Sequence, residues 1–63
     1  MMTTQSKLIT LITDGYRVEF QLVKSHVYIN AYRVGDLSTT IDTTKPTFGE
    51  AVSDIFRQIK GVS

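Results

Sequence analysis

Side chains able to do acid–base or nucleophilic chemistry are few in this chain. Its 63 residues include one histidine and no cysteine. His26 directly follows Ser25, and adjacent residues of a strand point to opposite faces, so these two cannot form a nucleophile–base pair. A histidine in this position is best explained as a turn or surface residue. We therefore expect no catalytic residue and no enzymatic activity.

The same scarcity argues against metal and cofactor sites. The absence of cysteine rules out thiolate zinc sites and disulfides, and one histidine alone cannot make a histidine-based metal site. The four glycines are isolated from one another, so no phosphate-binding loop is present. Asp14, Asp36 and Asp42 have the sequence context of turns and strand ends. We expect no metal and no cofactor.

Net charge and hydropathy limit the kinds of partner that the chain can bind. Seven Lys and Arg residues against six Asp and Glu give a net charge of +1, and the basic residues form no cluster. A dedicated duplex-binding domain usually carries a basic stripe. No segment approaches the roughly 18 apolar residues of a membrane span, and the N-terminus lacks a signal-peptide pattern. We expect a cytoplasmic protein that binds neither membranes nor, as its main partner, nucleic acid.

The clearest structural pattern predicts a helix over residues 47–61. Its apolar residues recur at helical spacing and form one stripe, which consists of Phe48, Ala51, Val52, Ile55, Phe56 and Ile59. Thr47 and Glu50 have the spacing of a capping box, and Gly61 stands where a left-handed residue would end the helix. Glu50 and Asp54 near the start and Arg57 and Lys60 near the end match the helix dipole and are explained as a solvated face. A helix with one apolar face needs one apolar surface to cover.

That surface is predicted to be an antiparallel meander. Residues 7–13 are rich in Ile and Thr and precede Asp14-Gly15, a strong type I′ hairpin signal, so we interpret them as a strand. The alternative is a short N-terminal helix with Leu8, Leu11 and Ile12 on one side. The next strands are residues 16–23 and 26–34. A two-residue turn at Lys24-Ser25 would set Val18 against Ala31, Phe20 against Ile29 and Leu22 against Val27, although Lys-Ser is a poor type I′ sequence and a longer loop is the other possibility.

The rest of the chain completes the architecture. After a turn at Gly35-Asp36, residues 37–42 form a short fourth strand, and residues 43–46 are a linker ended by Pro46. The fold class is therefore α+β, a three- or four-stranded antiparallel sheet with the C-terminal helix packed on one face. Residues 1–63 form a single domain whose first six residues are frayed. The predicted core is Ile9, Leu11, Val18, Phe20, Leu22, Val27, Ile29, Ala31, Ile41, Phe48, Val52, Ile55, Phe56 and Ile59.

A sheet covered by one helix leaves its other face open, and this is where we predict a binding surface. Aromatic residues, arginine and aliphatic side chains are typical of interfaces. The predicted surface consists of Leu8, Ile12, Arg17, Tyr28, Asn30 and Tyr32. Strand propensity and cross-strand pairing would also explain the tyrosines without any binding role.

These observations favour a small non-enzymatic protein-interaction module. It would act as an inhibitor, adaptor or regulator that docks on a larger protein or self-associates as a homodimer. Size alone suggests that a phage or mobile element encodes it. The alternative is a nucleic-acid-binding domain that stacks bases on Tyr28 and Tyr32, although Glu19 lies in the middle of that platform.

Overall fold

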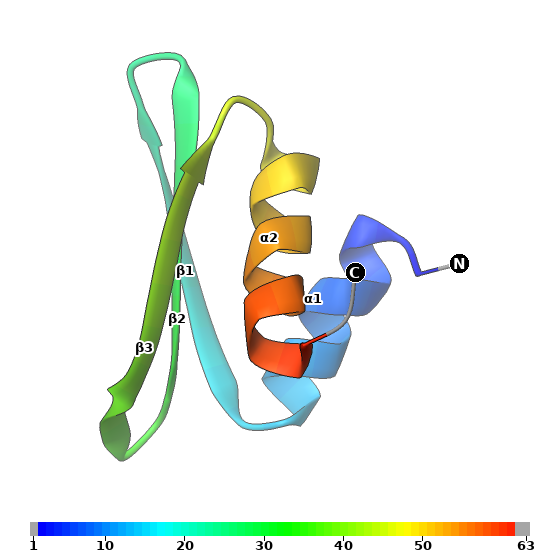
Figure 1. The fold of residues 1–63 in the computed structure, drawn as a ribbon, viewed down its shortest axis with the longest axis vertical. Helices are drawn as coiled ribbons and strands as arrows, with labels where there is room; N and C mark the ends of the chain where they lie inside the picture. Colours follow the sequence, from blue (N-terminus) through cyan, green and yellow to red (C-terminus); the bar gives the residue numbers. More distant parts are fainter. Residues whose placement is uncertain (1, 62–63) are drawn as a thin grey trace.

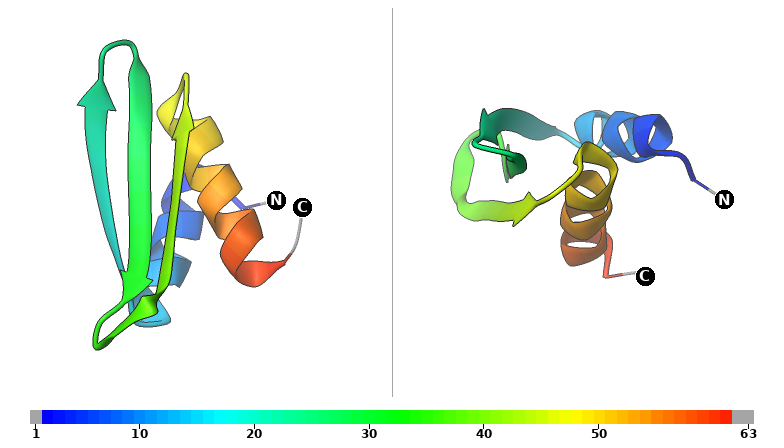
Figure 2. Two further views of the ribbon diagram at one scale, coloured as in Figure 1. Left: turned by 60° about the vertical axis from the view of Figure 1, so that its left-hand side comes forward. Right: turned by 90° about the horizontal axis from the view of Figure 1, so that it is seen from above.

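In the computed structural model, residues Met2–Gly61 are described, and they form two helices and one sheet. The order is α1 (Thr4–Thr13), β1 (Tyr16–Val23), β2 (His26–Arg33), β3 (Asp36–Lys45) and α2 (Phe48–Lys60). The strands form an antiparallel sheet in the order β1-β2-β3. Both helices lie on the same side of this sheet, and the other side is uncovered (Figures 1 and 2). The predicted α+β class and the packed C-terminal helix are confirmed.

Helix α2 forms as its sequence predicts. The Oγ1 atom of Thr47 accepts a hydrogen bond from the backbone amide of Glu50 at 3.2 Å and donates one to the Glu50 carboxylate at 2.8 Å. Gly61 ends the helix in the left-handed conformation with φ 70°, and its amide donates to the carbonyl of Arg57. Ala51, Val52, Ile55 and Phe56 are buried against the sheet and α1.

The first element is a helix, so the strand predicted for residues 7–13 is wrong and the alternative helix is correct. Thr3 caps α1 by accepting the amide of Ser6 at 3.0 Å, which also means that residues 4–6 are helical and not frayed. Leu11 is fully buried and Leu8 packs beside the core. Burial of one apolar stripe outweighs the weak strand propensity of Ile and Thr. Asp14-Gly15 consequently joins a helix to a strand and makes no hairpin.

The β1–β2 pairing matches the predicted register residue by residue. Val18 lies opposite Ala31, Phe20 opposite Ile29 and Leu22 opposite Val27. Lys24 and Ser25 do form a two-residue turn, and Lys24 has a positive φ of 58°. A turn with positive φ at the first central residue only is type II′, a class in which glycine normally takes that place.

Strand β3 is longer than predicted and begins irregularly. Thr43, Thr44 and Lys45, expected in a linker, pair with β2, and the preceding turn is Val34-Gly35. The register shifts between Ala31 and Arg33. Around this bulge, Thr39 Oγ1 accepts the amide of Arg33 at 2.8 Å and donates to the carbonyl of Asp36.

The core lies between the helices and the middle of the sheet. Its buried members are Leu11, Ile29, Ala31, Ala51, Val52, Ile55 and Phe56. Three predicted core residues are instead exposed: Ile9 by 54%, Phe20 by 62% and Leu22 by 76%. Ile9 is exposed because residues 7–13 are helical, and this helix turns Leu8 and Leu11 toward the core instead. For Phe20 and Leu22 the reason is length, because α1 has 10 residues, or about 15 Å at 1.5 Å per residue. Strand β1 has 8 residues, or about 27 Å at 3.4 Å per residue, so α1 covers only the half that starts at Tyr16 (Figure 1).

Candidate functional site

The side of the sheet away from the helices brings together four of the six predicted binding residues. Arg17 lies opposite Tyr32, and Asn30 and Tyr28 follow on the same face of β2. Arg17 is exposed, whereas Tyr28, Asn30 and Tyr32 are half-buried. This outer face also carries Glu19 and Gln21, as the register requires.

The other two predicted residues, Leu8 and Ile12, do not belong to this outer face. Both are on α1, which packs on the opposite side of the sheet. The error follows from the strand predicted for residues 7–13, because a strand would have turned these side chains outward. Leu8 packs against the core, and Ile12 is 60% exposed beside the start of β1.

Within the outer face, Tyr28 is tied to a neighbouring strand. Its hydroxyl donates a hydrogen bond of 3.2 Å to the carboxylate of Asp42 on β3. Desolvation, together with the negative charge and hydrogen bond of Asp42, raises the pKa of the Tyr28 hydroxyl above its ordinary value of 10.0. Cross-strand pairing therefore accounts for part of the reason why a tyrosine stands here.

A second surface runs along β1 on the side that faces the helices. Its members are apolar and exposed or half-buried: Ile12, Val18, Phe20 and Leu22, named here the β1 surface. Phe20 touches only one other ring, that of Phe48, in an edge-to-face contact with centroids 5.3 Å apart. Beyond it, Leu22 continues the same apolar row toward the end of the β1–β2 hairpin.

The β1 surface ends in a hollow of about 350 Å³ where α1 meets β1. The hollow is lined by Ile12, Tyr16, Arg17, Val18 and Val34. The guanidinium of Arg33 stacks over the Tyr16 ring at 5.0 Å, which holds this ring at the end of the sheet. The hollow is therefore a shallow, mainly apolar pocket beside the edge of β1.

The backbone of β1 adds hydrogen-bonding capacity to this surface. In a hairpin with a two-residue turn, the residues that flank the turn form a hydrogen-bonded pair, and such pairs recur at every second position. The pairs Val23–His26 and Gln21–Tyr28 therefore bond β1 to β2. It follows that Val18, Phe20 and Leu22 direct their backbone amides and carbonyls outward from the sheet edge. The side chains of these same residues belong to the β1 surface.

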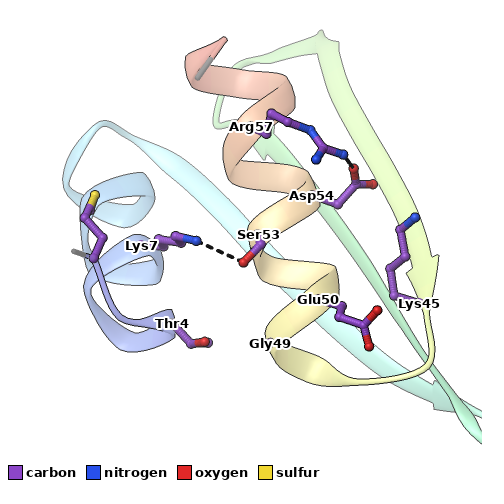
Figure 3. A pocket seen from close by; sticks show the side chains of 9 residues that line it. Thr4, Lys7, Lys45, Gly49, Glu50, Ser53, Asp54 and Arg57 are labelled. Carbon is purple, nitrogen blue, oxygen red and sulfur yellow. Dashed lines mark hydrogen bonds and ion pairs between the residues drawn. The ribbon is translucent and has the colours of Figure 1, made fainter. Parts of the chain in front are cut away.

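A third feature, a polar hollow of about 470 Å³, lies along α2 between α1 and the end of β3 (Figure 3). Lys7 on α1 donates to the hydroxyl of Ser53 on α2 at 2.9 Å, and its ammonium lies 5.9 Å from the centre of the Phe56 ring. A serine nucleophile needs a base that accepts its proton. Here the Lys7 ammonium donates to the hydroxyl, so this contact joins α1 to α2.

On the β3 side of the same hollow, Asp54 joins α2 to the sheet. Its carboxylate accepts hydrogen bonds from Thr43 of β3 at 2.5 Å and from Gln58 at 3.1 Å, and it pairs with Arg57. The Thr43 hydrogen bond, followed by the charges of Lys45 and Arg57, lowers the pKa of Asp54 despite its partial burial. Asp54 was expected on a solvated helix face, so its role as a link to β3 is a correction.

The described residues hold neither a group of three or more His, Cys, Asp or Glu side chains placed for a metal ion nor a helix long and apolar enough to cross a membrane. No protein-family model matches the chain, and neither the curated proteins nor the solved structures contain a significant match.

Sequence reasoning missed the β1 surface, although one signal for it was available. The row Tyr16, Val18, Phe20 and Leu22 alternates over the whole of β1. A helix over residues 4–13 is too short to cover that row, so the uncovered end could have been deduced once the helix was chosen.

Proposed function

We propose that this chain is a small non-enzymatic protein-interaction module of the cytoplasm, an inhibitor, adaptor or regulator that docks on a larger protein or self-associates. The observation that carries the proposal is the β1 surface, where Phe20 is 62% and Leu22 76% exposed beside an unpaired strand edge.

An exposed edge strand with apolar side chains is a template for pairing with another chain. Natural sheets commonly protect their edges with bulges, proline or charges. Strand β1 pairs with β2 without any register shift and contains no proline, and its charged residues, Arg17 and Glu19, lie on the outer face and not in the β1 surface. Contiguous exposed apolar side chains also mark interaction sites on small proteins. An interaction module accounts for both features.

The outer face takes a lesser part in this proposal. Tyr28 is engaged by Asp42, so one of the predicted anchors already has an intramolecular partner. Arg17, Asn30 and Tyr32 stay candidates for polar contacts at the rim of an interface. Changing Tyr28 and Tyr32 to serine together should leave the fold intact and weaken association less than a change at Leu22.

The proposal is tested by affinity capture combined with mass measurement. The parent chain and a Phe20→Ser/Leu22→Ser variant are used as baits in a lysate of the source cell, and light scattering gives the mass of each purified chain. The matched control is Leu37→Ser, which changes an apolar residue that is 71% exposed at the start of β3, away from the β1 surface. Loss of a partner or of self-association with the double variant, but not with the control, supports the proposal. Equal behaviour of all three contradicts it.

Nucleic acid is the alternative that the same material can test. The net charge of +1 predicts no tight, salt-sensitive binding to single- or double-stranded DNA or RNA. Fluorescence anisotropy should detect nothing tighter than micromolar at physiological salt. Submicromolar binding that weakens steeply with salt, and that Tyr28→Ser/Tyr32→Ser removes, would replace the proposed function with base stacking on the outer face.

A further inference from the structure

We propose that the occupant of the β1 surface is a second copy of this chain. Strand β1 pairs antiparallel with β1 of the second copy about a two-fold axis at Phe20, and the two three-stranded sheets join into one. Leu22 of each copy fills the hollow beside Val18 of the other. This inference rests on the proposed function and names the partner within it.

The backbone limits the possible registers. Tyr16, Val18, Phe20 and Leu22 direct their hydrogen-bonding groups outward, so in an added antiparallel strand they must face residues that do the same. A two-fold axis then passes through a residue that faces its own copy. The candidates are the residues in the middle of β1.

Charge removes two of these candidates. An axis at Glu19 would set two carboxylates directly opposite each other, and an axis at Arg17 would do the same with two guanidinium groups. Directly opposed like charges destabilise a strand pair. The axes at Val18, Phe20 and Gln21 have no such conflict.

The position of α1 decides among the remaining registers. Helix α1 covers the half of β1 that starts at Tyr16 (Figure 1). An axis at Val18 pairs only residues 16–20 and brings the two copies of α1 side by side on the joined sheet. An axis at Phe20 pairs residues 17–23 and sets the helices at opposite ends, whereas an axis at Gln21 shortens the pairing again.

The side chains agree with the axis at Phe20. Leu22, the most exposed residue of the β1 surface, then lies opposite Val18 of the second copy, and Val18 lines the hollow together with Ile12. Phe20 faces its own copy. On the outer face Glu19 faces Gln21, and the side-chain amide of Gln21 can donate a hydrogen bond to the carboxylate of Glu19. Apolar side chains thus meet apolar ones on the helix side, and the outer row meets no opposed like charges.

Leu22 allows a sharp mutational test because the chain contains a matched control. Leu22→Asp puts a carboxylate into the hollow of the second copy. Leu37→Asp changes a leucine of similar exposure at the other hairpin, since Leu37 is 71% and Leu22 76% exposed. Light scattering and sedimentation from micromolar to millimolar concentration should show that the parent chain forms a dimer. The dissociation constant of this dimer should rise about tenfold or more in Leu22→Asp and stay unchanged in Leu37→Asp. Circular dichroism should show equal helix content in all three.

Cysteine cross-linking tests the register, since the chain has no cysteine of its own. Glu19 and Gln21 face each other across the axis in a non-hydrogen-bonded pair, with a Cα separation of about 4.5 Å that suits a disulfide. A mixture of Glu19→Cys and Gln21→Cys chains carrying different mass tags should form the mixed disulfide far faster than either like pair. Both substitutions lie on the outer face, away from the apolar contacts.

Several results would overturn the inference. A parent chain that stays monomeric at all concentrations removes the second copy as partner, and the proposed function then depends on capture experiments that Leu22→Asp must still abolish. A dimer that tolerates Leu22→Asp, or that Leu37→Asp disrupts equally, does not use the hollow. Fast disulfide formation within Glu19→Cys chains alone would move the axis to Glu19.

Discussion

The two edge strands of the sheet, β1 and β3, differ in how far they are protected from pairing with other strands. Strand β3 begins with a bulge, where the hydroxyl of Thr39 accepts a hydrogen bond from the amide of Arg33. Near its end, the strand is tied to α2 by the hydrogen bond between Thr43 and Asp54. Its outer-face residues include Asp42 and Thr44, which are exposed and polar. Strand β1 pairs regularly to its end and carries exposed Phe20 and Leu22.

The difference shows how a short chain distributes its covering elements. Helix α2 has 13 residues and packs over β2 and β3, so the longer helix serves the β3 side. Helix α1 has 10 residues and packs over β1, which it cannot cover completely. A bulged and tethered edge resists pairing with other strands, whereas a regular apolar edge favours it.

The largest expected effect compares one aromatic residue on each side. Phe56 of α2 is only 8% exposed, so Phe56→Ala should destabilise the fold by about 3–5 kcal/mol through lost burial and a cavity. Phe20→Ala should destabilise the fold by about 1 kcal/mol or less, because Phe20 is 62% exposed and its contact with the ring of Phe48 is the main interaction lost. Denaturant unfolding at a concentration where the chain is monomeric measures both. Equal losses would show that β1 is as well covered as β3.

The second effect concerns the link between α2 and β3. Asp54→Asn removes the charged acceptor of the Thr43 hydrogen bond and should cost about 1.5 kcal/mol at neutral pH, the low end for charged hydrogen bonds. Because the folded-state pKa of Asp54 lies below its ordinary value of 3.8, its stabilisation is present above that pH and is lost as the pH falls through the folded-state pKa. The stability difference between parent and variant should therefore shrink in acid. A difference that is constant with pH contradicts this assignment.

Sequence reasoning succeeded where local signals agreed with tertiary packing. The stripe, cap and terminal glycine of α2 and the whole β1–β2 register were predicted correctly. The first element was wrong because Ile and Thr favour strands and Asp-Gly favours hairpins. The burial of Leu11 and the packing of Leu8 against the core are non-local contacts that favour the helix, and Thr3 caps its start.

The candidate site shows the same division. Arg17, Tyr28, Asn30 and Tyr32 share one face because alternation along a strand is a local property. Leu8 and Ile12 were misplaced together with α1. The β1 surface depends on the length of one helix relative to one strand, which no single segment reveals.

The third effect concerns the start of the helix that covers the β3 side. Thr47→Ala should cost about 1 kcal/mol, because the amide of Glu50 loses its acceptor. Thr47→Asp keeps an acceptor and adds a charge that suits the helix N-terminus, so it should be neutral or stabilising. Thermal unfolding compares the three chains. If all were equally stable, the contact between Thr47 and Glu50 would contribute nothing.

The smallest effect compares the turns of the two hairpins. In the β2–β3 turn, positive φ falls on Gly35 at 90°, where no Cβ is present. In the β1–β2 turn it falls on Lys24 at 58°, so the hairpin that carries the β1 surface also carries backbone strain. Lys24→Gly should relieve this strain. The stabilisation gained should exceed the destabilisation that arises because glycine raises the entropy of the unfolded chain, so the net gain in stability should be about 0.5 kcal/mol.

The neighbouring residue supplies the control for this last prediction. Ser25 has a negative φ, so Ser25→Gly relieves no strain and should destabilise the fold by about 0.5–1 kcal/mol through the unfolded state alone. The two glycine variants, measured side by side by denaturant unfolding, should therefore have opposite signs. If both destabilise the fold equally, Lys24 is unstrained, and the two hairpins of the sheet differ only in the side chains that they expose.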